Sequence, residues 1–156
     1  MKLDRIDFLI LGALQRDAAL SNKELARRVR LAPSSCLERA RKLRAAGILT
    51  GIHADVAPWA LGIQIQALIR VRLNQHTEKQ VLSFRNGLLS RPEVVSLFHL
   101  AGSDDFLVHV ALRDVQHIRT FGSEALTSHP LVSHVETSVV FEHRRSNLLP
   151  NYALDE

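Results

Sequence analysis

Apolar residues in the first third of the chain recur with the period of an α-helix. The first such run is Ile6, Leu9, Ile10, Ala13 and Leu14. Asp4 precedes this run in a position suited to capping the helix. A second apolar run follows Ser21-Asn22-Lys23-Glu24, whose serine and glutamate have the spacing of a capping box. The pattern predicts two helices, of which the second ends near Arg30.

A third helix is predicted from Pro33 to Ala46, after a tight turn over residues 30–32. Pro33 suits the first helical position because its missing N–H would have no partner there. Cys36, Ala40 and Leu43 share one face of this helix, which we expect to be buried. Two short helices joined by such a turn form the motif that reads the major groove of DNA.

The outward face of the third helix and its flanks carry hydroxyl groups first and basic groups after them. The DNA-facing residues predicted from this pattern are Ser34, Ser35, Glu38, Arg39, Arg41 and Lys42. Hydroxyl and basic side chains suit contacts with bases and phosphates, whereas Glu38 could accept from a cytosine amine. Gly47 is expected to end the helix, and Ile48 to Ala54 to form a short wing strand.

The second half of the chain changes to a period of two, which is typical of half-buried strands. Strands are predicted over Ile63–Leu73, Val94–Ala101, Phe106–Leu112 and Val132–Phe141. Helices are predicted from the Thr77–Gln80 capping box to about Ser90, and after Asp114. Ser90-Arg91-Pro92 and Ser128-His129-Pro130 form a faint internal repeat, 38 residues apart.

These elements predict an α+β protein with two domains. Residues 1–54 are a winged helix-turn-helix domain, residues 55–62 a linker with Pro58 and Trp59, and residues 63–156 a ferredoxin-like βαββαβ domain. In the latter, an antiparallel sheet carries both helices on one face. Arg70 and Arg72 and the aliphatic strands indicate that the other sheet face serves for association, at least into a dimer.

Charge is unevenly distributed along the chain. Residues 1–60 carry 11 Lys and Arg against 6 Asp and Glu, whereas residues 61–156 carry 9 against 10. The basic excess therefore coincides with the predicted helix-turn-helix, where double-stranded DNA would bind.

Several other classes of protein are not supported by the sequence. No apolar run is long enough to span a membrane, and Asp4, Asp7 and Arg16 interrupt any signal-peptide pattern. The single cysteine fits a reducing compartment, so we expect a cytoplasmic protein with Cys36 as a core residue. His99 and His109 could be cross-strand neighbours, but without a third ligand no metal site is predicted. Nucleophile-elbow, P-loop and dinucleotide motifs are absent, and no catalytic residue or cofactor is predicted.

The chain resembles the Lrp/AsnC family of bacterial and archaeal transcription regulators over nearly its whole length. The resemblance is carried by Leu3–Asp7, Ser21–Val29, Leu31–Leu43, Gly47-Ile48, Ala54–Gly62, Gly102–Phe106 and Asn147–Pro150. It implies a sequence-specific DNA-binding regulator that forms dimers through the linker and the sheet, and often octamers. It also implies a small effector, commonly an amino acid, bound near the turn between the second and third strands.

The effector-binding residues implied by the resemblance are Gly102, Asp104, Asp105, Thr137 and Ser138. Gly102 and Asp105 match the family's glycine-x-x-aspartate turn, in which glycine allows a positive φ and the aspartate can hold an ammonium group.

The chain departs from the family pattern at Arg30, Ala32, Glu38, Ala19 and Ala101. Two alternatives remain open. One is a tetrapyrrole- or haem-handling enzyme resembling sirohaem decarboxylases, in which the helix-turn-helix need not bind DNA. The other is an amino-acid sensor that acts only with a paralogue.

Overall fold

The computed structural model describes residues 1–74 and 77–154, so residues 75, 76, 155 and 156 of the predicted second domain lie outside it. The chain divides into two compact units. Of the described residues, the helical unit comprises 1–55 and 144–154, and the sheet unit 56–74 and 77–143. From the sequence, the C-terminal tail is expected to belong to the second domain. In the structure the tail packs with the first, where the Leu149 N–H donates to Gln15 Oε1 at 2.7 Å.

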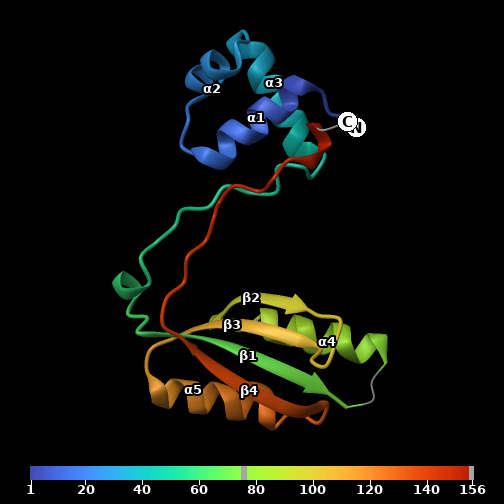
Figure 1. Cartoon of the computed structure of the whole chain (residues 1–156), viewed down its shortest axis with the longest axis vertical. Coiled ribbons are helices and arrows are strands. Elements are labelled where there is room, and N and C mark those ends of the chain that lie inside the picture. The colour runs from blue at the N-terminus through green and yellow to red at the C-terminus, as the bar shows by residue number, and fades with distance from the viewer. Residues whose placement is uncertain (75–76, 155–156) are drawn as a thin grey trace. The chain divides into compact units, whose positions relative to one another are not determined.

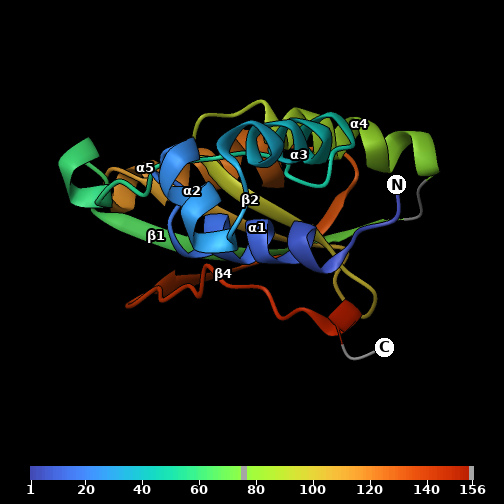
Figure 2. The same cartoon turned by 90° about the horizontal axis from the view of Figure 1, so that it is seen from above.

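The helical unit contains α1 (Arg5–Arg16), α2 (Asn22–Val29) and α3 (Pro33–Ala45), coloured blue to cyan in Figure 1 and seen from above in Figure 2. Its buried core consists of Ile10, Ala13, Leu14, Leu25, Ala26, Val29, Cys36 and Leu43. The helical period predicted these positions as apolar, but it also placed Leu9 in the same run, and Leu9 is 47 % exposed. The fully buried Cys36 is a core residue, and burial raises the pKa of its thiol.

Capping interactions fix where the first two helices begin. Ser21 and Glu24 form the predicted capping box on α2, in which the Ser21 N–H donates to Glu24 at 2.9 Å. Asp4 caps α1 as expected and forms a second capping box with Asp7. At the end of α2, Arg30 adopts left-handed backbone angles, φ 57° and ψ 46°. The turn that brings in α3 is therefore built on a residue with a side chain.

The predicted wing strand over Ile48 to Ala54 is wrong, because no strand forms in this segment. After α3 the chain turns at Gly47, which has φ 69°, and the N–H groups of Ile48 and Leu49 both donate to the Leu43 carbonyl. The two side chains then pack on the helical core. The apolar residues that suggested a strand instead complete the C-terminal end of α3.

The sheet unit holds, within the described residues, one four-stranded antiparallel sheet in the order β2-β3-β1-β4 (Figure 1). Its strands are β1 (Ile65–Leu73), β2 (Val94–His99), β3 (Phe106–Leu112) and β4 (Val132–Val140). Its helices are α4 (Glu78–Leu89) and α5 (Val115–Phe121), and α5 continues as a π-helix, Gly122–Thr127. The Thr77–Gln80 capping box and the Asp114 cap are both present.

One face of this sheet forms the core of the unit. Alternate residues of β1 and β3 are buried together with α4 residues Val81, Phe84 and Leu88, and with Phe121, Ala125 and Leu126 from α5 and the π-helix. Both helices therefore cover the same face, which confirms the βαββαβ arrangement. The preceding linker contains a short 3-10 helix, Pro58–Leu61. No helix of the described residues is long and apolar enough to cross a membrane.

Candidate functional site

The first candidate site is the outward face of α3. Ser34, Ser35, Glu38, Arg41 and Lys42 are all exposed, as the helical period predicted. No side chain among the described residues caps the start of α3, because the N-cap residue is Ala32 and Pro33 follows it. The positive end of the helix dipole is therefore not offset by a capping side chain. A helix end of this kind favours an anion such as a phosphate.

An ion pair organises the middle of this face. Lys42 Nζ lies 2.6 Å from Glu38 Oε1, one helical turn away, and both side chains are about two-thirds exposed. The hydrogen bond from Lys42 and its positive charge lower the pKa of Glu38. Glu38 therefore stays ionised and compensates part of the basic charge of α3.

Arg39 has partners within the helical unit, which the sequence analysis did not anticipate. Its Nη1 lies 2.7 Å from Asp4 Oδ2 and 2.8 Å from Asp7 Oδ1. The hydrogen bonds from the Asp7 backbone and from Arg39 lower the pKa of Asp4. Because the Asp7 side chain is only 7 % exposed, this guanidinium neutralises a largely buried carboxylate. The acidic third residue of α1 was the signal in the sequence that could have revealed this contact.

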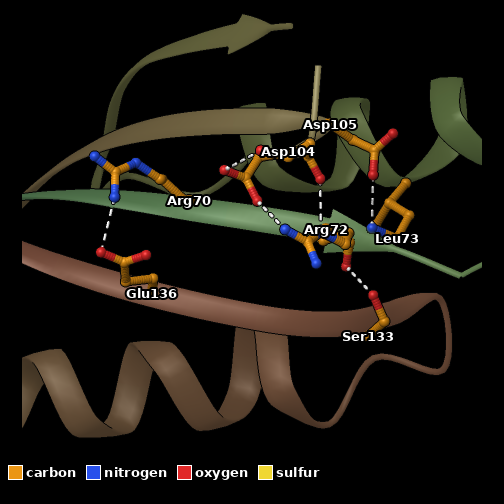
Figure 3. Close-up of polar contacts among 8 residues, drawn as sticks. Arg70, Arg72, Leu73, Asp104, Asp105, Ser133 and Glu136 are labelled. Atoms are coloured by element: carbon orange, nitrogen blue, oxygen red, sulfur yellow. Dashed lines mark hydrogen bonds and ion pairs between the residues drawn. The ribbon is translucent and has the colours of Figure 1, made fainter. Parts of the chain in front are cut away.

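The second candidate site is the turn between β2 and β3. Gly102 has φ 138°, a conformation that favours glycine. Asp105 joins the turn to β1 by two bonds. Its N–H donates to the Val71 carbonyl at 2.9 Å. Its Oδ2 accepts from the Leu73 N–H at 2.7 Å (Figure 3). The Asp105 carboxylate is thus oriented by the backbone of β1.

Arg72 on β1 holds the same turn from the other side, and the sequence analysis assigned it only to an association face. Its Nε donates to the Ser103 carbonyl at 2.6 Å, and its Nη2 lies 3.3 Å from Asp104 Oδ1 (Figure 3). Arg70, two residues earlier on β1, pairs with Glu136 of β4 at 2.7 Å. The turn therefore combines two carboxylates with one guanidinium.

Thr137 and Ser138 do not lie beside this turn within one chain. They pair with Ile69 and Leu68 of β1, whereas the turn contacts Val71, Arg72 and Leu73. Three residues along a strand correspond to about 10 Å. Adjacent residues of a strand point to opposite faces, so Thr137 and Ser138 also lie on different faces of the sheet.

His99 and His109 are not cross-strand neighbours, so that prediction is wrong. The turn also includes Leu100 and Ala101, and β2 therefore pairs His99 with Phe106 and Ser96 with His109. His109 is buried and bonds to Gln66 at 2.8 Å. Desolvation and the charge of the neighbouring His143 lower the pKa of His109. Among the described residues, no group of three or more His, Cys, Asp or Glu side chains could hold a metal ion.

A helix-turn-helix with an exposed basic second helix, joined to a ferredoxin-like unit, defines a class of DNA-binding regulators. Residues 3–50 match the winged helix-turn-helix DNA-binding family, and residues 66–148 match the Lrp/AsnC ligand binding domain. The chain belongs to the Lrp/AsnC family and is a DNA-binding transcriptional regulator.

The similarity extends to known proteins over most of their length. The chain is 41 % identical to the HTH-type transcriptional regulator AldR of Mycolicibacterium smegmatis, covering 92 % of this chain and 84 % of AldR. It is 33 % identical to the leucine-responsive regulatory protein of Escherichia coli, covering 94 % and 90 %.

The solved structure of a Neisseria meningitidis transcriptional regulator in complex with L-Met matches with a TM-score of 0.86 and 34 % identity, covering 98 % of this chain and 99 % of that one. The named relatives are transcriptional regulators rather than enzymes, and this favours the regulator over the tetrapyrrole alternative.

Proposed function

We propose that this regulator reads double-stranded DNA with the exposed face of α3 and responds to an amino acid bound at the Gly102–Asp105 turn. The DNA-binding part of the proposal rests on one observation: hydroxyl, acidic and basic side chains are exposed along α3. A protein with this activity would work in the cytoplasm, where the chromosome is accessible.

The five exposed residues predicted to face DNA have three roles in this proposal. Ser34 and Ser35, in the first turn, approach base edges or a phosphate as the helix enters the major groove by its N-terminus. Arg41 and Lys42 contact phosphates. Glu38 accepts a hydrogen bond from a cytosine amine and keeps Lys42 in place until DNA competes for it.

Arg39 receives a different role, although the sequence favoured a phosphate contact. Its ion pairs with Asp4 and Asp7 connect α3 to the start of α1, 35 and 32 residues away in the chain. We assign it to holding the recognition helix at a fixed orientation on the helical unit.

The DNA assignment is tested by replacing Arg41→Ala and Lys42→Ala together and measuring duplex binding by fluorescence anisotropy at several salt concentrations. Loss of two phosphate contacts lowers the slope of log K against log salt by about 2, because each neutralised phosphate contributes about 0.9. The matched control removes the same charge from exposed Lys79 and Arg119 of the sheet unit. An unchanged slope in the α3 variant, or an equal loss in the control, would contradict the assignment.

The effector half of the proposal rests on the geometry of the turn and on the ligand-binding domain that the family match identifies. Backbone N–H groups near Gly102 would bind the carboxylate of the amino acid, and Asp105 its ammonium group. The similar Neisseria regulator was solved with L-Met, so L-methionine is the first compound to test.

Asp105→Asn is the informative change at the turn, because an amide oxygen can still accept from the Leu73 N–H while the negative charge is lost. We expect L-methionine binding, measured by calorimetry, to weaken at least tenfold while DNA affinity without effector stays the same. Retained methionine binding in this variant would place the effector elsewhere. The DNA affinity of the same variant is measured as well, so a failure of the effector assignment can be distinguished from a failure of the α3 assignment.

Self-association completes the proposal. Trp59, Leu61 and Phe141 of the sheet unit have exposed fractions of 80 %, 65 % and 101 %. Large apolar side chains of this kind are characteristic of protein interfaces. We propose that they and the open sheet face form a dimer, and that dimers assemble into octamers. Thr137 and Ser138 would then complete an effector site at a contact between chains, and effector binding would shift the oligomer and the DNA affinity together.

A further inference from the structure

A cleft on the helical side of the sheet unit is separate from both sites described above. It has a volume of about 290 Å³ and lies between α4 and the π-helix Gly122–Thr127. The side chains considered below are Phe84, Leu88, Arg91, Glu124 and His129. The volume is close to the lower end of the range for small-molecule sites. We refer to this cavity as the α4–π cleft.

The internal repeat of the sequence places two nitrogen-bearing side chains in the lining of this cleft. Arg91 follows α4 in the segment Ser90-Arg91-Pro92, and His129 follows the π-helix in the matching segment Ser128-His129-Pro130. Equivalent positions of the two halves thus line one cavity.

Contacts around Arg91 and His129 position both groups. The Arg91 guanidinium carbon lies 5.9 Å from the centre of the Phe121 ring, a cation–π geometry, and no carboxylate of the described residues forms an ion pair with it. His129 Nδ1 accepts from the Leu131 N–H at 3.3 Å, so the neutral ring carries its proton on Nε2. The His129 ring also packs edge-on against Phe84, with centroids 4.8 Å apart.

The remaining lining groups limit what could bind. Glu124 contributes a carboxylate to the same cleft, whereas Phe84 and Leu88, only 4 % and 2 % exposed, form its floor and offer little apolar surface. Arginine and a histidine N–H recognise a carboxylate, whereas glutamate recognises an ammonium group and repels a second negative charge. We propose that the α4–π cleft binds a small zwitterion with one carboxylate and one ammonium group. Arg91 and His129 bind the carboxylate, and Glu124 the ammonium group.

Two further features fit a ligand at this place. The π-helix is a rare conformation that occurs often at functional sites. Gly87 of α4 also lines the cleft, and a Cβ placed on it would meet no heavy atom within 4 Å. Gly87 therefore leaves the cleft open, and a larger residue at this position would fill it.

The experiment is a nuclear magnetic resonance titration of the full-length protein, observing the His129 ring, whose signal is identified by its loss in His129→Gln. The probe is L-valine at millimolar concentration, compared with isovalerate, which lacks the ammonium group, and with isobutylamine, which lacks the carboxylate. We expect L-valine to move the His129 signal and each analogue to bind at least tenfold more weakly. Absence of a shift with L-valine, or equal binding of isovalerate, would overturn the proposal.

Gly87→Leu is the blocking variant. Leucine has a higher helix propensity than glycine, so α4 is expected to remain folded in this variant. Circular dichroism verifies this. The L-valine shift should disappear in Gly87→Leu and persist in Asp105→Asn, whose change lies at the turn. A shift that persists in folded Gly87→Leu, or that is lost in Asp105→Asn alone, would assign the signal to another site and overturn the proposal.

Discussion

Replacing Arg30 with glycine should stabilise the helical unit. Among the residues that the structure describes, Arg30 is the only non-glycine residue with a positive φ. The left-handed conformation costs a residue with a side chain roughly 1–2 kcal/mol. Glycine avoids this strain but loses about 0.5–1 kcal/mol through its greater freedom in the unfolded chain. The expected net gain in the free energy of unfolding is about 0.5–1 kcal/mol, or roughly a two- to fivefold change in the folded-to-unfolded ratio.

The matched control is Arg30→Ala, which removes the same charge and the same long side chain but keeps the strained backbone with a Cβ. Urea unfolding followed by circular dichroism compares the two variants. Hydrogen exchange at the Ala26 and Val29 amides then localises the change to α2. If Arg30→Gly is no more stable than Arg30→Ala, the strain argument is refuted, whatever either variant does relative to the parent chain.

Two further predictions follow from the charged groups. Glu38→Gln removes the 2.6 Å ion pair with Lys42 and frees that ammonium for phosphate. Because Lys42 no longer has to leave Glu38, binding of a random duplex, measured by anisotropy, should tighten while the salt slope stays the same; an unchanged affinity would show that Glu38 does not compete with DNA for Lys42. The second concerns His109, whose pKa is lowered from its ordinary 6.5 by burial and by His143, so the unfolded chain binds the proton more readily. The free energy of unfolding should therefore rise with pH below 6.5, and this contribution should be complete above pH 6.5. In His109→Gln, the urea midpoints measured at about pH 5 and about pH 7.5 should differ less than in the parent protein. An equal pH dependence in both proteins would contradict the role of His109.

The local elements of this protein could be predicted from the sequence because their causes lie within a few residues. The Ser21–Glu24 and Thr77–Gln80 capping boxes depend on groups three positions apart. The alternation in β1 reflects which face of one strand is buried. The order of these elements then leaves few ways to pair the strands, and the βαββαβ topology follows.

Only the tertiary structure decided the contacts between distant segments. Arg39 lies at the edge of a helical stripe in the sequence, but its partners Asp4 and Asp7 are more than 30 residues away. Likewise, a turn two residues longer than predicted changed the strand register and separated His99 from His109. The helical period specifies which residues face outward. Packing between elements decides which charges form ion pairs, which strand residues pair and which repeated segments line one cleft. No local sequence pattern encodes the distances between these residues.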